Sequence, residues 1–312
     1  MSACTLCKRY DAVFTRPYSG ERLCKRCFCK SIENKVRVTI SKYEMLKPDD
    51  KIMVAVSGGK DSVTLLHVLT KIERAFPEAM LCAVTVDEGI RGYRDEALKV
   101  AKKNYRKLGV EHVVTSFKEI SGYELDEIVS MTRKRGERGL TPCSYCGVLR
   151  RKALNTAARE AGVDKLATAH TLDDETQTMI LNIIHGDAVR IARVRPVLTE
   201  MHPKLVQRIK PLCGVLEKEV ALYAYLKKIE FQSIPCPYAG TALRNDVRTM
   251  LNRMEEKHAG TKFTIFKSIE RIRPALEAMA EETKLRNCKI CGEPTVSEIC
   301  KPCQLLRELS IL

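Results

Sequence analysis

The sequence predicts an α/β protein with a doubly wound parallel sheet, flanked by two small zinc modules. From residue 51 onward, apolar segments of strand length alternate with amphipathic segments of helix length, a pattern typical of a parallel sheet with helices on both faces. The stretch "MVAVSGGKDS" at 53–62 runs from an apolar strand through a glycine pair into a helix, as loops that bind phosphate do. Closely spaced cysteine pairs stand near both ends of the chain, which favours metal modules there.

The alternating region defines the expected elements. We expect strands at 51–57, 80–87, 111–117 and 165–170. We expect helices in the same region at 61–76, 94–109, 146–162 and 172–186. A basic helical connector is expected at 31–47, and 215–285 is expected to be mostly helical. Because ligands of parallel sheets bind beyond the carboxyl ends of the strands, residues that follow strands are the first candidates for a site.

The chain divides into four expected parts. These are an N-terminal zinc module at 1–30, a catalytic α/β domain with its helical connector at 31–232, a helical tail at 233–285 and a C-terminal zinc module at 286–312. There is no apolar run of the roughly 18 residues that a membrane span requires. The N-terminal stretch has no apolar signal region, so we expect a cytoplasmic protein.

The charge balance indicates a polyanionic partner. The chain carries 54 basic and 39 acidic residues, a formal charge of +15, which favours nucleic acid. Tryptophan is absent and aromatic residues make up 5%, which argues against binding that depends mainly on base stacking. The stretches "RKRGER" at 133–138 and "RIARVRP" at 190–196 are candidate contacts to an RNA backbone, with a solvated surface as the alternative for each.

Eight of the fourteen cysteines fall into two repeated patterns. Two close pairs near each end have the spacing of two knuckles that close one tetrahedral zinc site. The expected ligands are Cys4, Cys7, Cys24 and Cys27 at one end, and Cys288, Cys291, Cys300 and Cys303 at the other. Segments this short bury too little apolar surface to fold alone, so the metal would supply the folding energy. Cys29 is an alternative to Cys27 as a ligand.

The loop after the first strand is expected to hold phosphate. It consists of Ser57, Gly58, Gly59, Lys60, Asp61 and Ser62. Glycines let the backbone approach an anion closely, and the N–H groups at a helix N-terminus point at it. The serines add hydroxyl groups and Lys60 a positive charge. Asp61 either caps the helix or holds a magnesium ion that bridges phosphates.

"SGGKDS" resembles the pyrophosphate loop of the ATP pyrophosphatase (PP-loop) superfamily. Farther along, "TPCSYCGVLRR", "ATAHTLDDETQT" and "CPYAGT" follow in this order between the two cysteine modules. This combination is similar to the cytosolic tRNA 2-thiouridine synthetases of archaea and eukaryotes. The resemblance extends along nearly the whole chain and implies a PP-loop type of sheet.

The resemblance implies an ATP-dependent tRNA sulfurtransferase. ATP adenylates the C2 oxygen of a uridine and pyrophosphate leaves; sulfide then attacks C2, AMP leaves and 2-thiouridine remains. The implied nucleotide-binding residues are the loop itself with Ala55, Val86, Asp87, Arg150, Ala169 and His170. Asp174 would be catalytic, near magnesium or the reacting base, although a carboxylate there also suits a helix cap. For His170, the alternative to nucleotide binding is a purely structural role.

Three further cysteines are candidates for the sulfur chemistry. Cys143 and Cys146 lie in a proline-containing loop before a helix, where a helix N-terminus would lower their pKa. The pair is either a redox couple that carries a persulfide or, with Cys236, a set of three ligands for an iron–sulfur cluster. The resemblance implies the second, a 4Fe-4S cluster on three cysteines. Cys82 is expected in the core, and Cys213 is not expected to be a ligand.

The family that the sequence resembles has two branches, which thiolate different uridines of tRNA. Arg150 stands where some relatives that thiolate the T-loop uridine carry lysine, and "CGVLRR" resembles the branch that acts on the wobble uridine. The Cys24–Cys27 knuckle also resembles that branch. The alternatives are thiolation of the T-loop uridine, a non-catalytic tRNA-binding zinc protein, and another ATP pyrophosphatase such as an amidotransferase subunit. Expected partners are tRNA, a sulfur donor (sulfide or a ubiquitin-like thiocarboxylate carrier) and a second copy of the chain in a homodimer.

Overall fold

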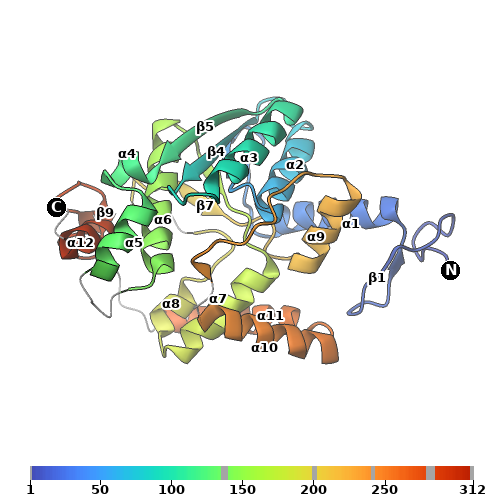
Figure 1. Cartoon of the computed structure of the whole chain (residues 1–312). Coiled ribbons are helices and arrows are strands. Elements are labelled where there is room, and N and C mark those ends of the chain that lie inside the picture. The colour runs from blue at the N-terminus through green and yellow to red at the C-terminus, as the bar shows by residue number, and fades with distance from the viewer. Residues whose placement is uncertain (1, 135–139, 199–201, 240–242, 279–284, 310–312) are drawn as a thin grey trace.

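A parallel sheet forms the centre of the molecule (Figure 1). The computed structural model describes residues 2–134, 140–198, 202–239, 243–278 and 285–309. The five strands lie in the order β5-β4-β3-β6-β7 and all pair in parallel. Their bounds are β3 Lys51–Ala55, β4 Met80–Asp87, β5 Glu111–Ser116, β6 Lys165–Ala167 and β7 Gln207–Ile209. The sequence did not predict β7, because three residues carry no readable alternation.

Helices cover both faces of the sheet. One face carries α1 Lys25–Lys42, α2 Lys60–Glu73, α3 Arg94–Leu108 and α9 Glu217–Leu226. The other face carries α4 Phe117–Ser121, α5 Leu125–Lys134, α6 Pro142–Glu160 and α12 Lys301–Glu308. Along β3, Ile52 and Val54 belong to the first core and Met53, between them, to the second. The central strand is therefore apolar on both faces, as the doubly wound fold requires.

A further layer of helices lies below the sheet in the view of Figure 1. It consists of α7 Leu172–Ile184, α8 Ala188–Ala192, α10 Leu243–Lys257 and α11 Thr261–Ala278. Helix α7 follows β6 directly and packs against α8, α10 and α11. This layer therefore meets the carboxyl ends of the strands, where parallel sheets bind their ligands.

The two cysteine modules lie at opposite ends of the molecule (Figure 1). The N-terminal module holds β1 Phe14–Thr15 and β2 Arg22–Leu23 and leads into α1. Helix α1 begins at Lys25 rather than near residue 31, because the sulfur of Cys24 accepts the N–H of Cys27 as an N-cap. Leu23 and Phe28 belong to the core of the first sheet face, so this module packs directly on the α/β domain.

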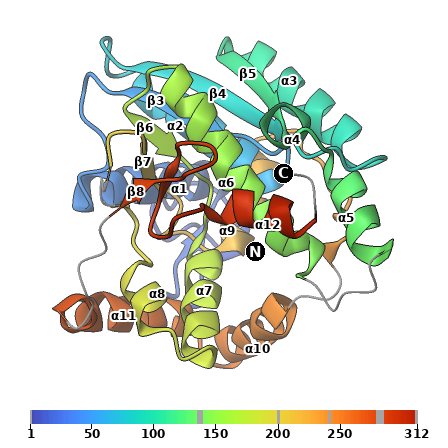
Figure 2. The ribbon, with the colours of Figure 1, turned by 90° about the vertical axis from the view of Figure 1, so that its left-hand side faces the viewer.

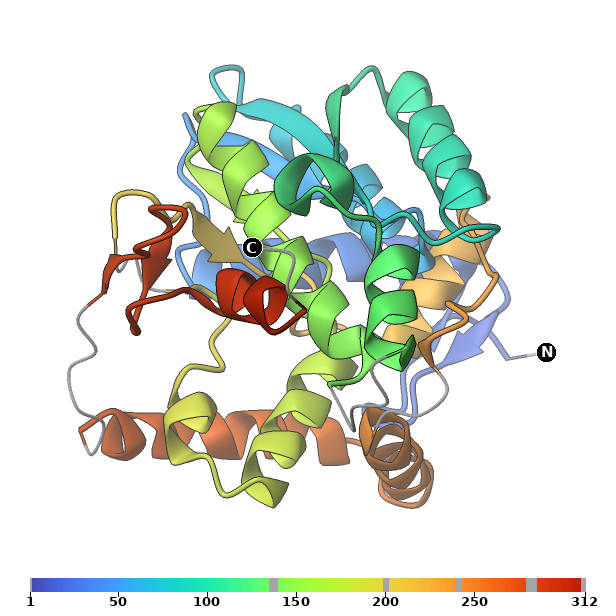
Figure 3. The ribbon, with the colours of Figure 1, turned by 60° about the vertical axis from the view of Figure 1, so that its left-hand side comes forward.

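The C-terminal module packs on helix α6 (Figures 2 and 3). It consists of β8 Arg286–Asn287, β9 Pro294–Thr295 and α12. Arg159 on α6 binds both carboxylate oxygens of Glu293, at 2.7 and 3.1 Å, and Leu305 on α12 joins the core of the second sheet face. The division into four parts at 30, 232 and 285 stays a prediction. Within the described residues, no helix is long and apolar enough to span a membrane.

Candidate active site

The loop between β3 and α2 has a backbone shape that requires glycine. Gly58 has a φ of +90°, in the left-handed region, and a Cβ built on it would lie 2.5 Å from the carbonyl oxygen of Ala97. Gly59 is the N-cap of α2 and leaves the helix without a side-chain cap. The first N–H groups of α2 therefore face the loop with no side-chain acceptor, the arrangement that binds phosphate.

Two serines hold this loop in shape. The N–H of Ser57 donates to Oγ of Ser62 at 3.1 Å, and that hydroxyl donates to the carbonyl oxygen of Gly59 at 2.9 Å. The hydroxyl of Ser57 lies 3.1 Å from that of Ser62. Ser62 is buried whereas Ser57 is exposed, so Ser57 remains accessible to a ligand in the loop.

Two carboxylates lie beside Lys60 at the start of α2. Lys60 Nζ lies 3.0 Å from Asp61 and 2.6 Å from Glu217. Oδ1 of Asp61 is buried and has no hydrogen-bond partner within the described residues. Burial raises the pKa of Asp61 to about 6, opposed by Lys60 and aided by Glu217 and Asp174. A buried, unpartnered carboxylate oxygen next to a phosphate-binding backbone is a suitable ligand for magnesium bridging phosphates.

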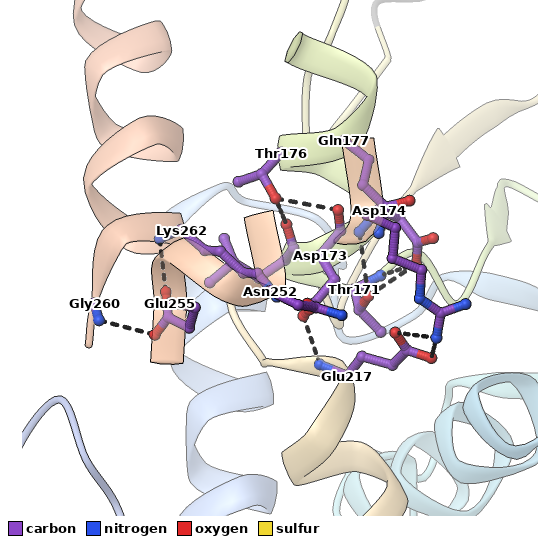
Figure 4. Close-up of polar contacts among 12 residues, drawn as sticks. Thr171, Asp173, Asp174, Thr176, Gln177, Glu217, Asn252, Glu255, Gly260 and Lys262 are labelled. Atoms are coloured by element: carbon purple, nitrogen blue, oxygen red, sulfur yellow. Dashed lines mark hydrogen bonds and ion pairs between the residues drawn. The ribbon is translucent and has the colours of Figure 1, made fainter. Parts of the chain in front are cut away.

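The two aspartates at the start of α7 have separate structural partners (Figure 4). Asp174 accepts the N–H and the hydroxyl of Thr171 at 2.9 and 2.8 Å, so it forms a capping box. Asp173 forms a buried ion pair with Lys262 of α11 and accepts the N–H of Glu217 at 2.7 Å. Asp173 thus ties together α7, α9 and α11, and a catalytic role for Asp174 stays a prediction beside its observed cap.

A buried carboxylate joins the loop to the sulfur side of the site. Glu88, 2% exposed, lies just after β4. Its Oε2 is 2.6 Å from Nε of Arg94, and its Oε1 is 2.8 Å from Nε of Arg150. Arg94 donates to the carbonyl oxygen of Ser57 at 2.9 Å, and Arg150 donates to Sγ of Cys146 at 3.0 Å. One chain of contacts therefore runs from the phosphate loop to a candidate cluster ligand.

The three cysteines predicted for sulfur chemistry are neighbours. Helix α6 begins at Pro142, so Cys143 and Cys146 lie in its first two turns and not in the loop that the sequence suggested. The reason is that proline suits the first turn of a helix. Cys143 Sγ contacts the carbonyl oxygen of Tyr238 at 3.4 Å, which brings the segment of Cys236 to the start of α6. Cys143 and Cys236 are also close enough to Cys146 to raise its pKa through their charges.

The expected lowering of the thiol pKa is wrong for Cys146. Burial raises its pKa to about 11, and the positive charge of Arg150 only partly offsets this effect. The pKa of Cys236 is likewise raised, first by burial. At these thiols, desolvation therefore raises the pKa by more than a helix N-terminus lowers it. Buried thiols in this setting need a cation, such as the iron of a cluster, to become thiolates.

Spacing separates this set of cysteines from the terminal ones. The four sulfurs of Cys4, Cys7, Cys24 and Cys27 lie within 4.8 Å of one another, as do those of Cys288, Cys291, Cys300 and Cys303. Sulfurs about 2.3 Å from a tetrahedral zinc ion are about 3.8 Å apart, and Cys7 and Cys24 are 3.8 Å apart. Cys29 lies outside the first set. The sulfurs of Cys143, Cys146 and Cys236 do not all lie within 4.8 Å of one another, a wider spacing that suits a cluster better than one ion.

The residues predicted to face adenosine lie at the carboxyl edge of the sheet. Ala55 ends β3, Val86 and Asp87 end β4, and Ala169 and His170 follow β6. Nδ1 of His170 lies 2.9 Å from the Thr168 hydroxyl. Desolvation by the surrounding protein, then Lys210, lowers its pKa to about 4. His170 is therefore neutral near pH 7.

The sequence did not reveal several residues of the site. Glu88 and Glu217 were missed because they pair with residues far away in the sequence, Arg150 and Lys60. Arg94 was missed with Glu88, its ion-pair partner. Glu88 directly follows a predicted strand, a position that could have singled it out. Most of "RKRGER", at 133–138, lies outside the described residues. Cys82 is half-buried in β4, where it packs against the core as expected. Cys213 is fully buried.

The sequence is similar to those of known proteins. The chain matches the PP-loop domain family over residues 30–255. The tRNA 2-thiolation protein NcsA of Haloferax volcanii is 35% identical over 324 residues, covering 98% of each chain. Cytoplasmic tRNA 2-thiolation protein 1 of Aspergillus niger is 33% identical over 310 residues, covering 99% of this chain and 89% of the relative. The chain belongs to this tRNA 2-thiolation family of PP-loop ATP pyrophosphatases.

A solved structure of the family extends the likeness to the fold. The U34-tRNA thiolase NcsA from Methanococcus maripaludis with its [4Fe-4S] cluster has a TM-score of 0.86 and 36% sequence identity. The match covers 100% of this chain and 98% of that one. The predicted family and the doubly wound parallel sheet of PP-loop type are therefore confirmed. The names of the fungal relatives place them in the cytoplasm, as the sequence predicted here.

Gly58→Ala tests the loop of this family member. The added methyl group would collide with the Ala97 carbonyl oxygen, and φ would stay in a region that costs alanine about 1–2 kcal/mol. We expect ATP affinity to fall at least tenfold in equilibrium binding measurements. Gly59→Ala is the matched control, because its Cβ would meet nothing closer than 3.5 Å and its φ is −76°. Equal effects of the two variants would contradict the proposed loop strain.

Glu88→Gln tests the bridge between loop and cysteines. The variant keeps the side-chain shape but leaves Arg94 buried without its negative partner, at a cost on the order of 3 kcal/mol. We expect a lower melting temperature and weaker ATP binding. Glu230→Gln removes an exposed pair with Lys103, worth less than about 1 kcal/mol. If the two variants melt and bind ATP alike, Glu88 does not hold the loop.

Proposed function

We propose that this chain is an ATP-dependent sulfurtransferase that converts the wobble uridine of tRNA, U34, to 2-thiouridine. The observation that supports it most is the chain of contacts from Ser57 through Arg94, Glu88 and Arg150 to Cys146. It joins a phosphate-binding loop to a cysteine set at one edge of the sheet. A non-catalytic tRNA-binding protein would not need this connection.

The first half-reaction activates the uridine. The C2 oxygen attacks the α-phosphorus of ATP, the bond to the β-phosphate breaks and pyrophosphate leaves. The N–H groups at the start of α2, the Ser57 hydroxyl and Lys60 would bind the departing pyrophosphate. Asp61 would hold magnesium between the phosphates with its unpartnered Oδ1. Val86, Asp87, Ala169 and His170 would line the adenosine, and Asp174 would lie near the magnesium or the base.

The second half-reaction replaces oxygen with sulfur. Sulfide attacks C2, the C2–O bond breaks and AMP leaves with the former carbonyl oxygen. A 4Fe-4S cluster held by Cys143, Cys146 and Cys236 would supply an iron with an open position that can hold the sulfide. Arg150, which donates to Cys146, would stabilise negative charge on sulfur and on the leaving phosphate. Sulfide or a ubiquitin-like thiocarboxylate carrier would supply the sulfur.

The remaining cofactors and partners belong to the same proposal. Each terminal set of four cysteines would hold one structural zinc ion. The basic surface would bind tRNA, and the protein would act as a homodimer in the cytoplasm. The wobble position rests on the likeness to the U34 thiolase of Methanococcus maripaludis and on Arg150. Mass spectrometry of tRNA from a strain without the protein tests this choice, because loss of thiolation in the T-loop instead of at U34 would contradict it.

Replacement of the three central cysteines separates the cluster from the persulfide route. We expect Cys143→Ala, Cys146→Ala and Cys236→Ala each to reduce the iron content from about four atoms per chain and to abolish thiolation. ATP binding and about two zinc ions per chain should remain. Cys82→Ala, in β4, is the control and should retain iron and activity. Full thiolation by anaerobically prepared, iron-free protein would contradict the cluster and favour a persulfide.

The raised pKa of Asp61 predicts a pH dependence of nucleotide binding. Below about pH 6 the carboxyl group is protonated, and a neutral carboxyl group binds magnesium poorly. We expect the affinity for ATP with magnesium to fall by up to about tenfold per pH unit between pH 6 and pH 5. Asp61→Asn should bind weakly at every pH and lose this dependence. A pH dependence that persists in Asp61→Asn would assign it to another group.

A further inference from the structure

A large cavity lies outside the site described above. Its volume is about 950 Å³, and its walls come from α6, α8, the segment around β7 and the C-terminal cysteine module. Figures 2 and 3 show these elements side by side, with α12 and β8 next to α6 and with α8 below them. Cys300 and Lys301 of the C-terminal module are part of the wall. The cavity therefore exists only when this module is folded against α6.

The cavity is strongly basic. Among the lining residues that the structure describes, two are acidic, and each has an arginine partner. Glu277 pairs with Arg195 at 2.6 Å, and Glu293 pairs with Arg159 at 2.7 Å. The other charged residues of the wall are Arg151, Lys152, Arg190, Arg193, Arg208 and Lys301. Such an excess of cations around one cavity attracts an anion.

Two arginines of the wall repel each other. Burial, and to a smaller extent the charge of Arg151, lowers the pKa of Arg208 to about 10. The pKa of Arg151 is lowered by burial and by Arg150 and Arg190. Nε of Arg208 is buried and has no acceptor within the described residues. An oxyanion between these guanidinium groups would relieve the repulsion and satisfy the buried donor.

The size and walls of the cavity favour a nucleic acid strand over a free inorganic anion. Val148, Val189, Leu205 and Pro302 provide apolar surface, which suits a ribose or a base. Arg151 follows Arg150, the residue that contacts Cys146. Along α6, Arg151 is displaced from Cys146 by about 7.5 Å of rise and about 140° of rotation, so the two side chains point to different sides of the helix. A strand with its target base at the cysteines would therefore pass around the start of α6 and place a phosphate a few nucleotides away in the cavity.

We propose that this cavity holds the backbone of the tRNA strand a few nucleotides from the target uridine, with Arg151 and Arg208 clamping its phosphates. The inference rests on the proposed function, because tRNA is the polyanion that the reaction requires. The C-terminal module would thus be one wall of the RNA-binding site as well as a stabilising element. Lysine and arginine side chains around the rim would add contacts that fix the register of the strand without reading its sequence.

The test uses the full chain and an anticodon stem-loop RNA with an unmodified wobble uridine. We expect Arg151→Gln/Arg208→Gln to bind this RNA at least tenfold more weakly than the wild type. The slope of log affinity against log salt should become shallower by about 1.4, or about 0.7 for each lost phosphate contact on a single strand. Arg74→Gln, at the C-cap of α2 away from the cavity, should change neither quantity. ATP affinity and metal content of the double variant should match the wild type.

A second arm locates the contact on the RNA. Neutral methylphosphonate groups are introduced singly at each phosphate of the anticodon loop. At one position or more, the substitution should weaken binding to the wild type and have no effect on the double variant. If the double variant retains wild-type affinity and salt slope, or if every methylphosphonate acts equally on both proteins, the cavity is not the RNA site.

The two proposals fail separately. A wild type that binds the RNA through Arg151 and Arg208 but never thiolates it would overturn the proposed function and leave the RNA site intact. A wild type that thiolates the RNA while the double variant binds it normally would overturn the RNA site alone.

Discussion

Glu88 is the residue on which the geometry of the site depends most. Its carboxylate lies between two guanidinium groups in a region almost closed to water, at 2.6 Å from Arg94 and 2.8 Å from Arg150. A buried ion pair seldom adds net stability over an apolar replacement, yet removing one partner is costly. The arrangement therefore makes more sense as a positioning device. Arg94 reaches the loop at Ser57, Arg150 reaches Cys146, and the carboxylate fixes both with respect to the sheet.

The rest of the fold brings other charged groups to the same edge. Asp173 anchors α7 to α11 through Lys262 and to α9 through the N–H of Glu217. Glu217 in turn pairs with Lys60 of the loop. The helices below the sheet are thus attached to the loop by ion pairs. Because these groups are largely buried, salt would screen them much less than it would screen the basic surface.

The sequence predicted the loop, most strands and the terminal cysteine sets, because each is marked by residues close together in the chain. The glycine pair identifies the loop, and at Gly58 a positive φ beside a helix start needs glycine. Alternating apolar segments reveal four of the five strands. The repeated cysteine spacing likewise predicts the terminal sets that the structure assembles. Strand β7 has three residues, too few for a pattern.

Other features depend on contacts between distant segments, which one sequence does not reveal. The bridge of Glu88 joins residues 62 positions apart, and the environment of Cys146 depends on burial that only the folded chain creates. The prediction of a lowered thiol pKa failed for this reason. The basic stretch at 190–196 was found from its composition, but its opposite wall, with Arg151 and Arg208, comes from α6 and β7.

Transfer of the uridine oxygen to AMP is the central claim about the chemistry, and an isotope measurement tests it most directly. An RNA substrate carrying ¹⁸O at C2 of the wobble uridine is thiolated with ATP and sulfide, and the released AMP is examined by mass spectrometry. Activation at the PP-loop predicts one ¹⁸O atom in the phosphate of AMP for each 2-thiouridine formed. Recovery of the label in pyrophosphate or water, with unlabelled AMP, would contradict adenylation of the C2 oxygen.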